Sequence, residues 1–250
     1  MSLEDTARDW TRHGNDDPLW AVLVDPAKRG GGWDIDDFLA TGKEDVDTAL
    51  GVLDRLGGTP TQTGVALDFG CGAGRLTQAL AAHYDKVIGL DISEPMLATA
   101  RRLDRTGGRA DFQHNATADL AAIPTASVDL VFTSIVLQHV PPDAAEKYLL
   151  EFGRVLRPGG AAIILMPTGI RPTIQGLLFR YAPPAVVGAL QQRLLHYPAP
   201  MQMNTLPVRI MTSHLSRAGL RIIGTTDEPQ HAPHWNFTRY YAIRPKTSVA

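Results

Sequence analysis

The feature that most constrains the fold is a run of glycines at the point where a short apolar segment gives way to a helical one. Residues 65–69 read Val-Ala-Leu-Asp-Phe, and residues 70–74 read Gly-Cys-Gly-Ala-Gly. Glycines at such a turn allow positive φ angles and let backbone N–H groups approach a ligand closely. A second strand-like segment ends in Asp91, 17 positions after Gly74 (91 − 74). This pattern predicts a βαβ unit with a nucleotide site at the carboxyl edge of its strands.

The alternation of short apolar runs with helical spacing continues along the chain. Unbroken apolar runs are typical of strands buried on both faces, as in a parallel sheet. We therefore predict an α/β fold, an open and mostly parallel sheet with helices on both faces. Strands are expected at 65–69, 86–91, 110–114, 128–134, 161–166, 220–226 and 236–244, and helices at 44–56, 75–82, 94–103, 142–155 and 210–218.

Composition limits the class of protein. With 250 residues, 44% of them hydrophobic and 20% charged, the chain suits one globular domain. Its 24 basic against 26 acidic side chains give a net charge of −2, which argues against a dedicated nucleic-acid binder. The single cysteine, Cys71, has no partner for an internal disulfide, and the start of the chain lacks a signal-like pattern, so we expect a cytoplasmic protein. The longest apolar run, near 161–166, is far shorter than the roughly 20 residues that span a membrane.

Four segments are expected within residues 1–250, which we interpret as a single domain. Residues 1–44 form an N-terminal cover whose Trp10, Trp20 and Trp33 either close over a ligand or serve as packing anchors. Residues 64–166 form the core that carries the glycine turn, 167–207 an insertion, and 208–250 complete the sheet. Within the insertion, 174–197 is rich in Leu, Tyr and Val, which would suit an apolar ligand or, equally, ordinary packing or a homodimer contact.

A nicotinamide-dependent oxidoreductase would share the βαβ start, but two residues count against it. Counting from Gly70, the third glycine of a G-x-G-x-x-G motif falls on Arg75. Asp68, just before the turn, would repel phosphates, whereas its carboxylate suits a ligand with a cationic amino group. The residues instead follow the pattern D-x-G-x-G-x-G.

In that pattern the chain resembles the class I S-adenosylmethionine (SAM)-dependent methyltransferases. The resemblance runs over about 64–166 and rests on VALDFGCGAGRLT at 65–77, IGLDISEPML at 88–97 and LRPGG at 156–160. It implies a Rossmann-like sheet of seven strands with the last strand antiparallel. It also implies SAM as the cofactor and S-adenosylhomocysteine as the product. Residues 64–166 would then be the SAM-binding core, and 167–207 would be the substrate cover that this family often inserts after the fifth strand.

The resemblance carries over to individual positions. Asp68 and the glycine loop would hold the methionine part of SAM, Asp91 the ribose, and Ile92 with Met96 the adenine faces. The Gly-Asp pair that usually meets the adenine edge is replaced here by Asn115 and Ala116, so a backbone or Asn115 contact would substitute. The residues assigned to the cofactor are Asp68, Phe69, Gly70, Cys71, Gly72, Gly74, Asp91, Ile92, Met96, Asn115, Ala116 and Ser134.

For catalysis, the end of the fourth strand is the expected meeting point of acceptor and methyl group. His139 is the candidate base because histidine titrates near neutrality, and the alternative is that it caps or packs the following helix. His231, His234 and Trp235 are further candidates to face the acceptor. The two histidines have zinc-like spacing but no evident Cys or acidic partner, and we expect no metal.

We interpret the chain as a SAM-dependent methyltransferase of a small molecule, with a hydroxyl oxygen favoured as the acceptor atom. The preference for oxygen rests on His139 and on missing motifs: there is no Asn/Asp-Pro-Pro-Tyr after the fourth strand and no acidic pair of the arginine-methylating kind. Methylation at nitrogen or carbon, a SAM-binding protein without turnover, and a nicotinamide-dependent oxidoreductase stay open as alternatives.

Overall fold

A computed structural model describes residues 2–228 and 234–246. Within these ranges seven strands form one sheet in the order β3-β2-β1-β4-β5-β7-β6. The strands are β1 (Val65–Phe69), β2 (Lys86–Asp91), β3 (Ala110–His114), β4 (Val128–Ser134), β5 (Leu156–Ile170), β6 (Arg221–Asp227) and β7 (Trp235–Ile243). β1 to β5 pair in parallel, and β7 runs antiparallel to both β5 and β6. The predicted fold class, including the antiparallel last strand, is confirmed.

Helices cover both faces of the sheet. Neighbouring residues of β1 show this, because Ala66 belongs to a core cluster with α3 (Ile35–Arg55) and α4 (Arg75–Leu80), whereas Leu67 packs with α6 (Pro142–Val155) and α9 (Val208–Arg217). Successive side chains of a strand point to opposite faces, so the two helix pairs lie on opposite sides. A further helix, α5 (Glu94–Leu103), packs near β3.

The N-terminal segment is more helical than its sequence indicates. It holds α1 (Leu3–Asp16), α2 (Pro18–Val22) and the short 3₁₀ turn η1 (Pro26–Lys28). Ser2 and Asp5 form a reciprocal capping box at the start of α1. The first core helix also starts earlier than the expected residue 44, because the Asp34 side chain accepts the backbone N–H groups of Asp36 and Asp37 and so caps α3.

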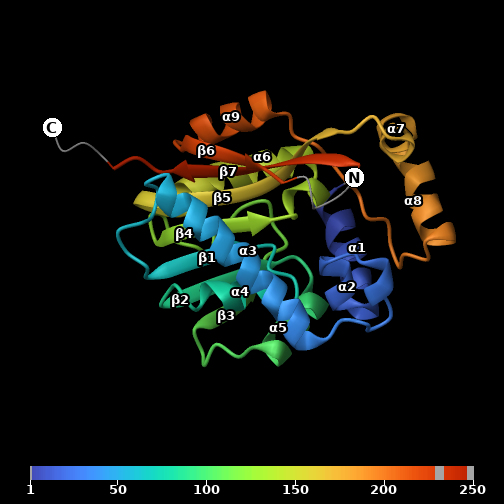
Figure 1. Cartoon of the computed structure of the whole chain (residues 1–250), viewed down its shortest axis with the longest axis horizontal. Coiled ribbons are helices and arrows are strands. Elements are labelled where there is room, and N and C mark those ends of the chain that lie inside the picture. Colours follow the sequence, from blue (N-terminus) through green and yellow to red (C-terminus); the bar gives the residue numbers. More distant parts are fainter. Residues whose placement is uncertain (1, 229–233, 247–250) are drawn as a thin grey trace.

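Figure 1 shows α1 and α2 beyond the carboxyl ends of the parallel strands, with α7 (Ile174–Tyr181) and α8 (Pro184–Leu194) further out on the same side. A second 3₁₀ turn, η2 (Leu137–His139), follows β4. In an open parallel sheet, ligands bind at the carboxyl ends of the strands where the strand order reverses, which here is between β1 and β4. Across the described residues, we find no helix with the length and apolar character needed to cross a bilayer.

Candidate active site

A cavity of about 600 Å³ lies at this switch point. Its walls come from the ends of β1, β2 and β4, from α1 and α2, from the 191–203 segment and from the start of β7. Eight of the predicted site residues line it: Phe69, Gly70, Gly72, Asp91, Ile92, Asn115, Ser134 and His139. We call the part formed by the first seven, which the sequence analysis assigns to the cofactor, the cofactor wall. The part around Trp10, His139, Met203 and Trp235 is called the acceptor wall.

Two positions of the glycine loop, Gly70 and Gly72, require glycine. Gly70 has φ of +75°, and a Cβ there would lie 2.3 Å from Cγ1 of Val136. Gly72 has φ of +52°, and its Cβ would lie 2.8 Å from Cγ2 of Val22. The backbone N–H groups of Gly70 and Cys71 donate to the carbonyl of Leu90, which folds the loop over the end of β2. The turn thus needs glycine for backbone conformation and for close approach.

Asp91 connects the loop to the next strand. Its Oδ2 accepts the N–H of Gly72 at 2.8 Å and its Oδ1 accepts the N–H of Ser93 at 2.8 Å. Burial raises the pKa of the Asp91 carboxyl, while these backbone donors act in the opposite direction. Each carboxylate oxygen can accept more than one hydrogen bond, so both retain capacity for two adjacent hydroxyl groups of a ligand in the cavity.

Asp68 lies behind the loop and does not line the cavity. Its Oδ2 accepts the hydroxyl of Thr77 at 2.6 Å, and its Oδ1 is buried without a hydrogen-bond partner. Complete burial raises the pKa of this carboxyl to about 7, although Thr77 and Arg75 both act to lower it. The sequence predicts that Asp68 contacts a cationic amino group of the ligand directly. Because Asp68 does not line the cavity, this contact stays a prediction.

Four other predicted residues also stand away from the cavity wall. Cys71 is buried between the loop and Gly89, and burial raises the pKa of its thiol well above the ordinary value. Gly74, with φ of +85°, is the N-cap of α4. Met96 is fully buried, close to Gly14 of α1, and Ala116 is exposed. The first three have packing roles in the described structure.

Ile92 and Asn115 stand together at the adenine end that the resemblance predicts. The N–H of Asn115 donates to the carbonyl of Asp91, and the Nε2 of His114 lies 3.0 Å from the carbonyl of Ile92. The side-chain Nδ2 of Asn115 donates to the carbonyl of Thr117. Asn115 is therefore held in place by its own loop, and it still lines the cavity.

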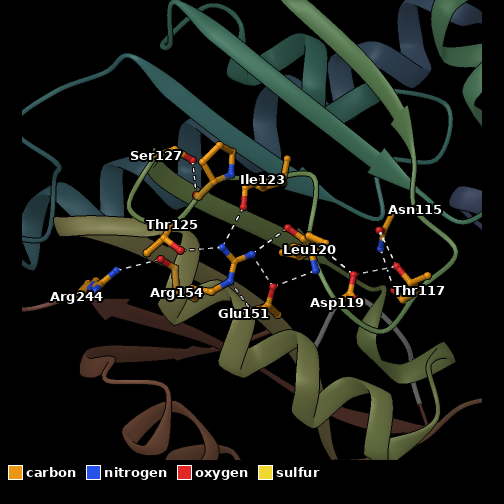
Figure 2. A network of polar contacts seen from close by, with 12 residues as sticks. Asn115, Thr117, Asp119, Leu120, Ile123, Thr125, Ser127, Glu151, Arg154 and Arg244 are labelled. Atoms are coloured by element: carbon orange, nitrogen blue, oxygen red, sulfur yellow. Dashed lines mark hydrogen bonds and ion pairs between the residues drawn. The ribbon is translucent and has the colours of Figure 1, made fainter.

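A network around Arg154 holds the irregular loop that follows Asn115 (Figure 2). The guanidinium donates to Glu151, to the carbonyls of Leu120 and Ile123, and to the hydroxyl of Thr125. Glu151 in turn accepts the N–H of Leu120. A loop without regular ladder bonds needs such side-chain partners for its buried backbone groups. The network thereby anchors the far end of the segment that begins at Asn115.

The end of β4 is both strained and polar. Ile135, which lines the cavity, has φ of +56°, an uncommon and unfavourable conformation for a β-branched residue. Beside it, Ser134 lies 3.5 Å from Asp45, whose carboxylate bridges Arg75 at 3.3 Å and Arg239 at 2.7 Å. All three charged side chains are almost fully buried. This ion cluster ties α3, α4 and β7 together directly behind the site.

His139 lies in the acceptor wall at the end of η2. Its Nδ1 is 2.5 Å from the carbonyl of Gln202, so Nδ1 carries the proton and Nε2 presents a lone pair. The Trp10 ring packs edge-on at 5.0 Å between centroids. Burial lowers the pKa of His139 to about 4, so the ring is neutral at pH 7.

The acceptor wall is apolar and aromatic. Met203 and Ile135 pack against a buried cluster that contains Trp235 and Phe237. Among the described residues that line the cavity there is no Lys or Arg, and its charged side chains are Asp25 and Asp91. Such a lining favours an acceptor without a large negative charge.

The N-terminal tryptophans divide between the two expected roles. Trp10 and Trp33 line the cavity, whereas Trp20 is buried and stacks edge-on against Tyr197. His234 and Trp235 line it as well, and His231 lies outside the described residues. In the described ranges, no cluster of three His, Cys, Asp or Glu side chains is arranged to hold a metal ion.

Several lining residues were missed by the sequence analysis: Leu3, Thr6, Val22, Leu23, Gln138, Tyr148, Gln191, Met201 and Met203. The Thr6 hydroxyl lies 3.5 Å from the carbonyl of His139, and the Ser93 hydroxyl donates to the carbonyl of Trp10 at 3.1 Å. The capping pattern at Ser2 and Asp5 could have revealed α1. The contacts of α1 with the site carry no comparable local signal.

The sheet order, the glycine loop and Asp91 define a Rossmann-like protein that binds a nucleotide-type cofactor. Comparison with known proteins narrows this class. Residues 66–160 match a family model described as a methyltransferase domain. A ubiquinone biosynthesis O-methyltransferase of Azoarcus sp. is 31% identical over 191 residues, which cover 73% of each chain. The chain belongs to the class I SAM-dependent methyltransferases, and SAM is the cofactor of this family.

Two further comparisons agree. A trans-aconitate 2-methyltransferase of Methylobacterium nodulans is 35% identical over 154 residues, 60% of this chain and 55% of that protein. The chain thus matches about half the length of this relative. A crystal structure of a SAM-dependent methyltransferase from Mesorhizobium loti has a TM-score of 0.53 and 22% identity, covering 76% of this chain and 96% of that one. At 22% sequence identity, this structural similarity shows that the two proteins share a fold and nothing more.

Proposed function

We propose that the chain transfers the methyl group of SAM to a hydroxyl oxygen of a small, largely apolar and uncharged acceptor. The observation that carries this proposal is a single cavity lined by the glycine loop, by Asp91 and by a wall of Met203, Trp235 and Phe237 without a cationic side chain. The names of the relatives, which include an O-methyltransferase, agree with oxygen as the acceptor atom.

The cofactor wall fits SAM in its polar and apolar parts. Asp91 has free acceptor capacity for the ribose hydroxyls, and Ile92 offers an apolar contact for adenine. Gly70 and Gly72 bring the loop backbone next to the cavity without side chains. Bound SAM supplies an electrophilic methyl group on a sulfonium sulfur. The protein then has to align an acceptor with it and take up the acceptor's proton.

His139 is the residue we assign to the proton. The carbonyl of Gln202 fixes the Nδ1–H tautomer, which leaves Nε2 to accept the hydroxyl proton as the oxygen–methyl bond forms. Because its pKa is about 4, the neutral ring is a weak base. We therefore expect a contribution to kcat near the low end of the general-base range, about 10²-fold, with alignment by the apolar wall supplying most of the acceleration.

Residues 167–207 act in this proposal as a substrate cover. Gln191, Leu195, Tyr197, Met201 and Met203 all belong to this segment and line the cavity. The Nε2 and Oε1 of Gln191 bond the carbonyl and the N–H of Met201, which ties α8 to the acceptor wall. The cover and α1 therefore enclose the acceptor from two sides.

The test is a methyl-transfer screen read by mass spectrometry of the acceptors. It should include neutral phenols and aliphatic alcohols, amines of similar size, and trans-aconitate as a polyanion. We expect methylation of apolar hydroxyl compounds and little transfer to trans-aconitate. Exclusive transfer to amines, to carbon or to the polyanion would overturn the acceptor class. SAM binding without turnover on any compound would favour a non-catalytic SAM-binding protein.

A further inference from the structure

Two helices at the outer edge of the molecule turn apolar stripes toward solvent. In α7, Ile174, Leu178 and Tyr181 follow one another at spacings of four and three, so they share a helix face. Ile174 is 91% exposed and Tyr181 73% exposed. A helix of a globular protein usually buries such a stripe against the core.

The neighbouring helix repeats the pattern. Val186, Leu190 and Leu194 of α8 recur every fourth residue, and all three are exposed, Leu194 by 67%. The opposite side of α8 is the one that packs inward: Gly188 lies against Pro200, and Gln191 is buried and bonded to Met201. The outward direction of the stripe is thus set by polar contacts on the inner side. We call Ile174, Leu178, Tyr181, Val186, Leu190 and Leu194 the α7–α8 surface.

The stretch of sequence that carries this surface contains charged side chains of one sign. Between Glu151 and Asp227 the sequence contains eight arginines and no Asp, Glu or Lys, although the whole chain has a net charge of −2. Arg171, Arg180 and Arg193 fall in the segment that carries the two helices, and Arg193 is exposed on α8. A helix with an exposed apolar stripe and arginines but no acidic residues is typical of segments that lie on an anionic bilayer.

We propose that the α7–α8 surface docks onto an anionic membrane surface, with the apolar stripes entering the headgroup boundary and Arg193 facing the lipid phosphates. The helices have 8 and 11 residues, too few to span a bilayer but suited to lie in its plane. A second copy of the chain fits less well, because an isologous dimer would bring like-charged arginines together. Figure 1 shows α7 and α8 projecting from the body of the protein, clear of the sheet.

This inference goes beyond the proposed acceptor and has a consequence for it. Gln191 and Leu195 line the cavity from the α8 side, while Leu190 and Leu194 are on the exposed stripe. A docked protein would therefore have only α8 and the segment after it between lipid and cavity. That position would let an apolar acceptor reach the cavity from the bilayer.

The experiment is flotation of the full chain with two kinds of vesicle, phosphatidylcholine alone and phosphatidylcholine with about one third phosphatidylglycerol. We expect binding to the anionic vesicles, weaker at higher salt, and little binding to the neutral ones. The double variant Ile174→Ser/Leu194→Ser should lower the partition coefficient about 100-fold. Each substitution removes one apolar side chain from the membrane, which should lower the partition coefficient about tenfold. Arg193→Glu should lower it about tenfold.

Leu56→Ser is the matched control, since Leu56 is an exposed leucine (38%) at the end of α3 and outside this surface. It should bind vesicles like the wild type. SAM affinity by calorimetry should be unchanged in every variant, which separates this proposal from the methyltransferase function. Equal binding to both vesicle types, or an unchanged double variant, would overturn the proposal. A dimer in sedimentation that dissociates in the double variant would also overturn it, because it would indicate a second copy of the chain as the partner. Binding to poly-glutamate that the double variant does not change would overturn it too, because it would indicate an acidic protein as the partner.

Discussion

The cofactor wall and the acceptor wall line one cavity but are built in different ways. On the cofactor side, Asp91 and the loop glycines come from adjacent strand ends and are fixed by backbone hydrogen bonds of 2.8 to 2.9 Å. On the acceptor side, Trp10 and His139 come from segments more than 100 residues apart and meet through ring packing. The first wall is specified by a local motif, and the second by how the covers assemble on the sheet.

The largest expected effect tests the cofactor wall. Asp91→Ala removes the carboxylate that we propose accepts both ribose hydroxyls, and it releases the N–H groups of Gly72 and Ser93. At about 1.5–3 kcal/mol per charged bond, we expect the Kd for SAM to rise about 10³-fold by calorimetry. Asp91→Asn, which keeps one acceptor oxygen, should lose less. An unchanged Kd in Asp91→Ala would remove the ribose assignment and with it the contrast between the walls.

His139 belongs to the acceptor wall, so its loss should leave SAM affinity unchanged. We expect His139→Ala to lower kcat about 10²-fold, with a smaller loss for acceptors of lower pKa, which need a base less. Since only the neutral ring accepts a proton and its pKa is about 4, the wild-type rate should fall as pH drops toward 4. A pH limb near 6.5 would show that burial does not lower the pKa of His139. A folded His139→Ala with the wild-type kcat would contradict the base role. The exposed His83 offers the control variant His83→Ala.

A second histidine should report on the stability of the N-terminal cover. His13 of α1 is buried, and burial lowers its pKa from 6.5 to about 4, although Asp16 and the backbone of Pro200 and Ala199 act in the opposite direction. Between these two values the unfolded chain binds more protons than the folded one, so stability rises with pH over this window and is lost as pH falls. The contribution of His13 to the free energy of unfolding should be about 2.5 kcal/mol lower at pH 4.5 than at pH 7.

His13→Leu should remove this part of the pH dependence while keeping the site filled. Urea denaturation at pH 7 and pH 4.5 measures it as the difference between variant and wild type. Other groups, such as Asp68 with its raised pKa, act equally in both proteins and cancel. Parallel pH curves for the two proteins would show that His13 titrates normally, and hence that α1 is loosely placed over the site.

The two walls also differ in how far the sequence predicted them. The sequence placed several residues at the carboxyl edge of the sheet, because the carboxyl ends of parallel strands meet there. These are the glycine loop, Asp91, Ile92, Asn115 and Ser134. Burial of individual side chains within that edge could not be read: Asp68 and Met96 face the packed interior rather than the cavity. Spacing along a motif gives the position of a residue on an element, but not which of its neighbours covers it.

The sequence predicted His139 and Trp235 of the acceptor wall, but it did not predict the helix α1 beside them, because α1 lacks an apolar stripe. The residues it buries include Thr6, Asp9, His13 and Gly14, so hydrophobic periodicity gives no helix signal there. Its polar side chains are satisfied or enclosed only after folding, for example when Thr6 approaches the carbonyl of His139. A helix that covers a site through polar and aromatic contacts is stabilised by tertiary contacts, so its position cannot be predicted from local sequence.

The smallest expected effect sharpens the contrast from the acceptor side. Met203 packs against the buried cluster that contains Trp235 and Phe237 at the cavity wall. Met203→Ala removes apolar contact with the acceptor, and we expect KM for the acceptor to rise about tenfold while the Kd for SAM stays the same. Met211→Ala is the matched control, because Met211 is equally apolar but buried in the core cluster of α6 and α9. It should lower the free energy of unfolding without moving the acceptor KM. If Met203→Ala instead weakened SAM binding as much as acceptor binding, the two walls would act as one site, and the acceptor specificity proposed for the apolar wall would lose its basis.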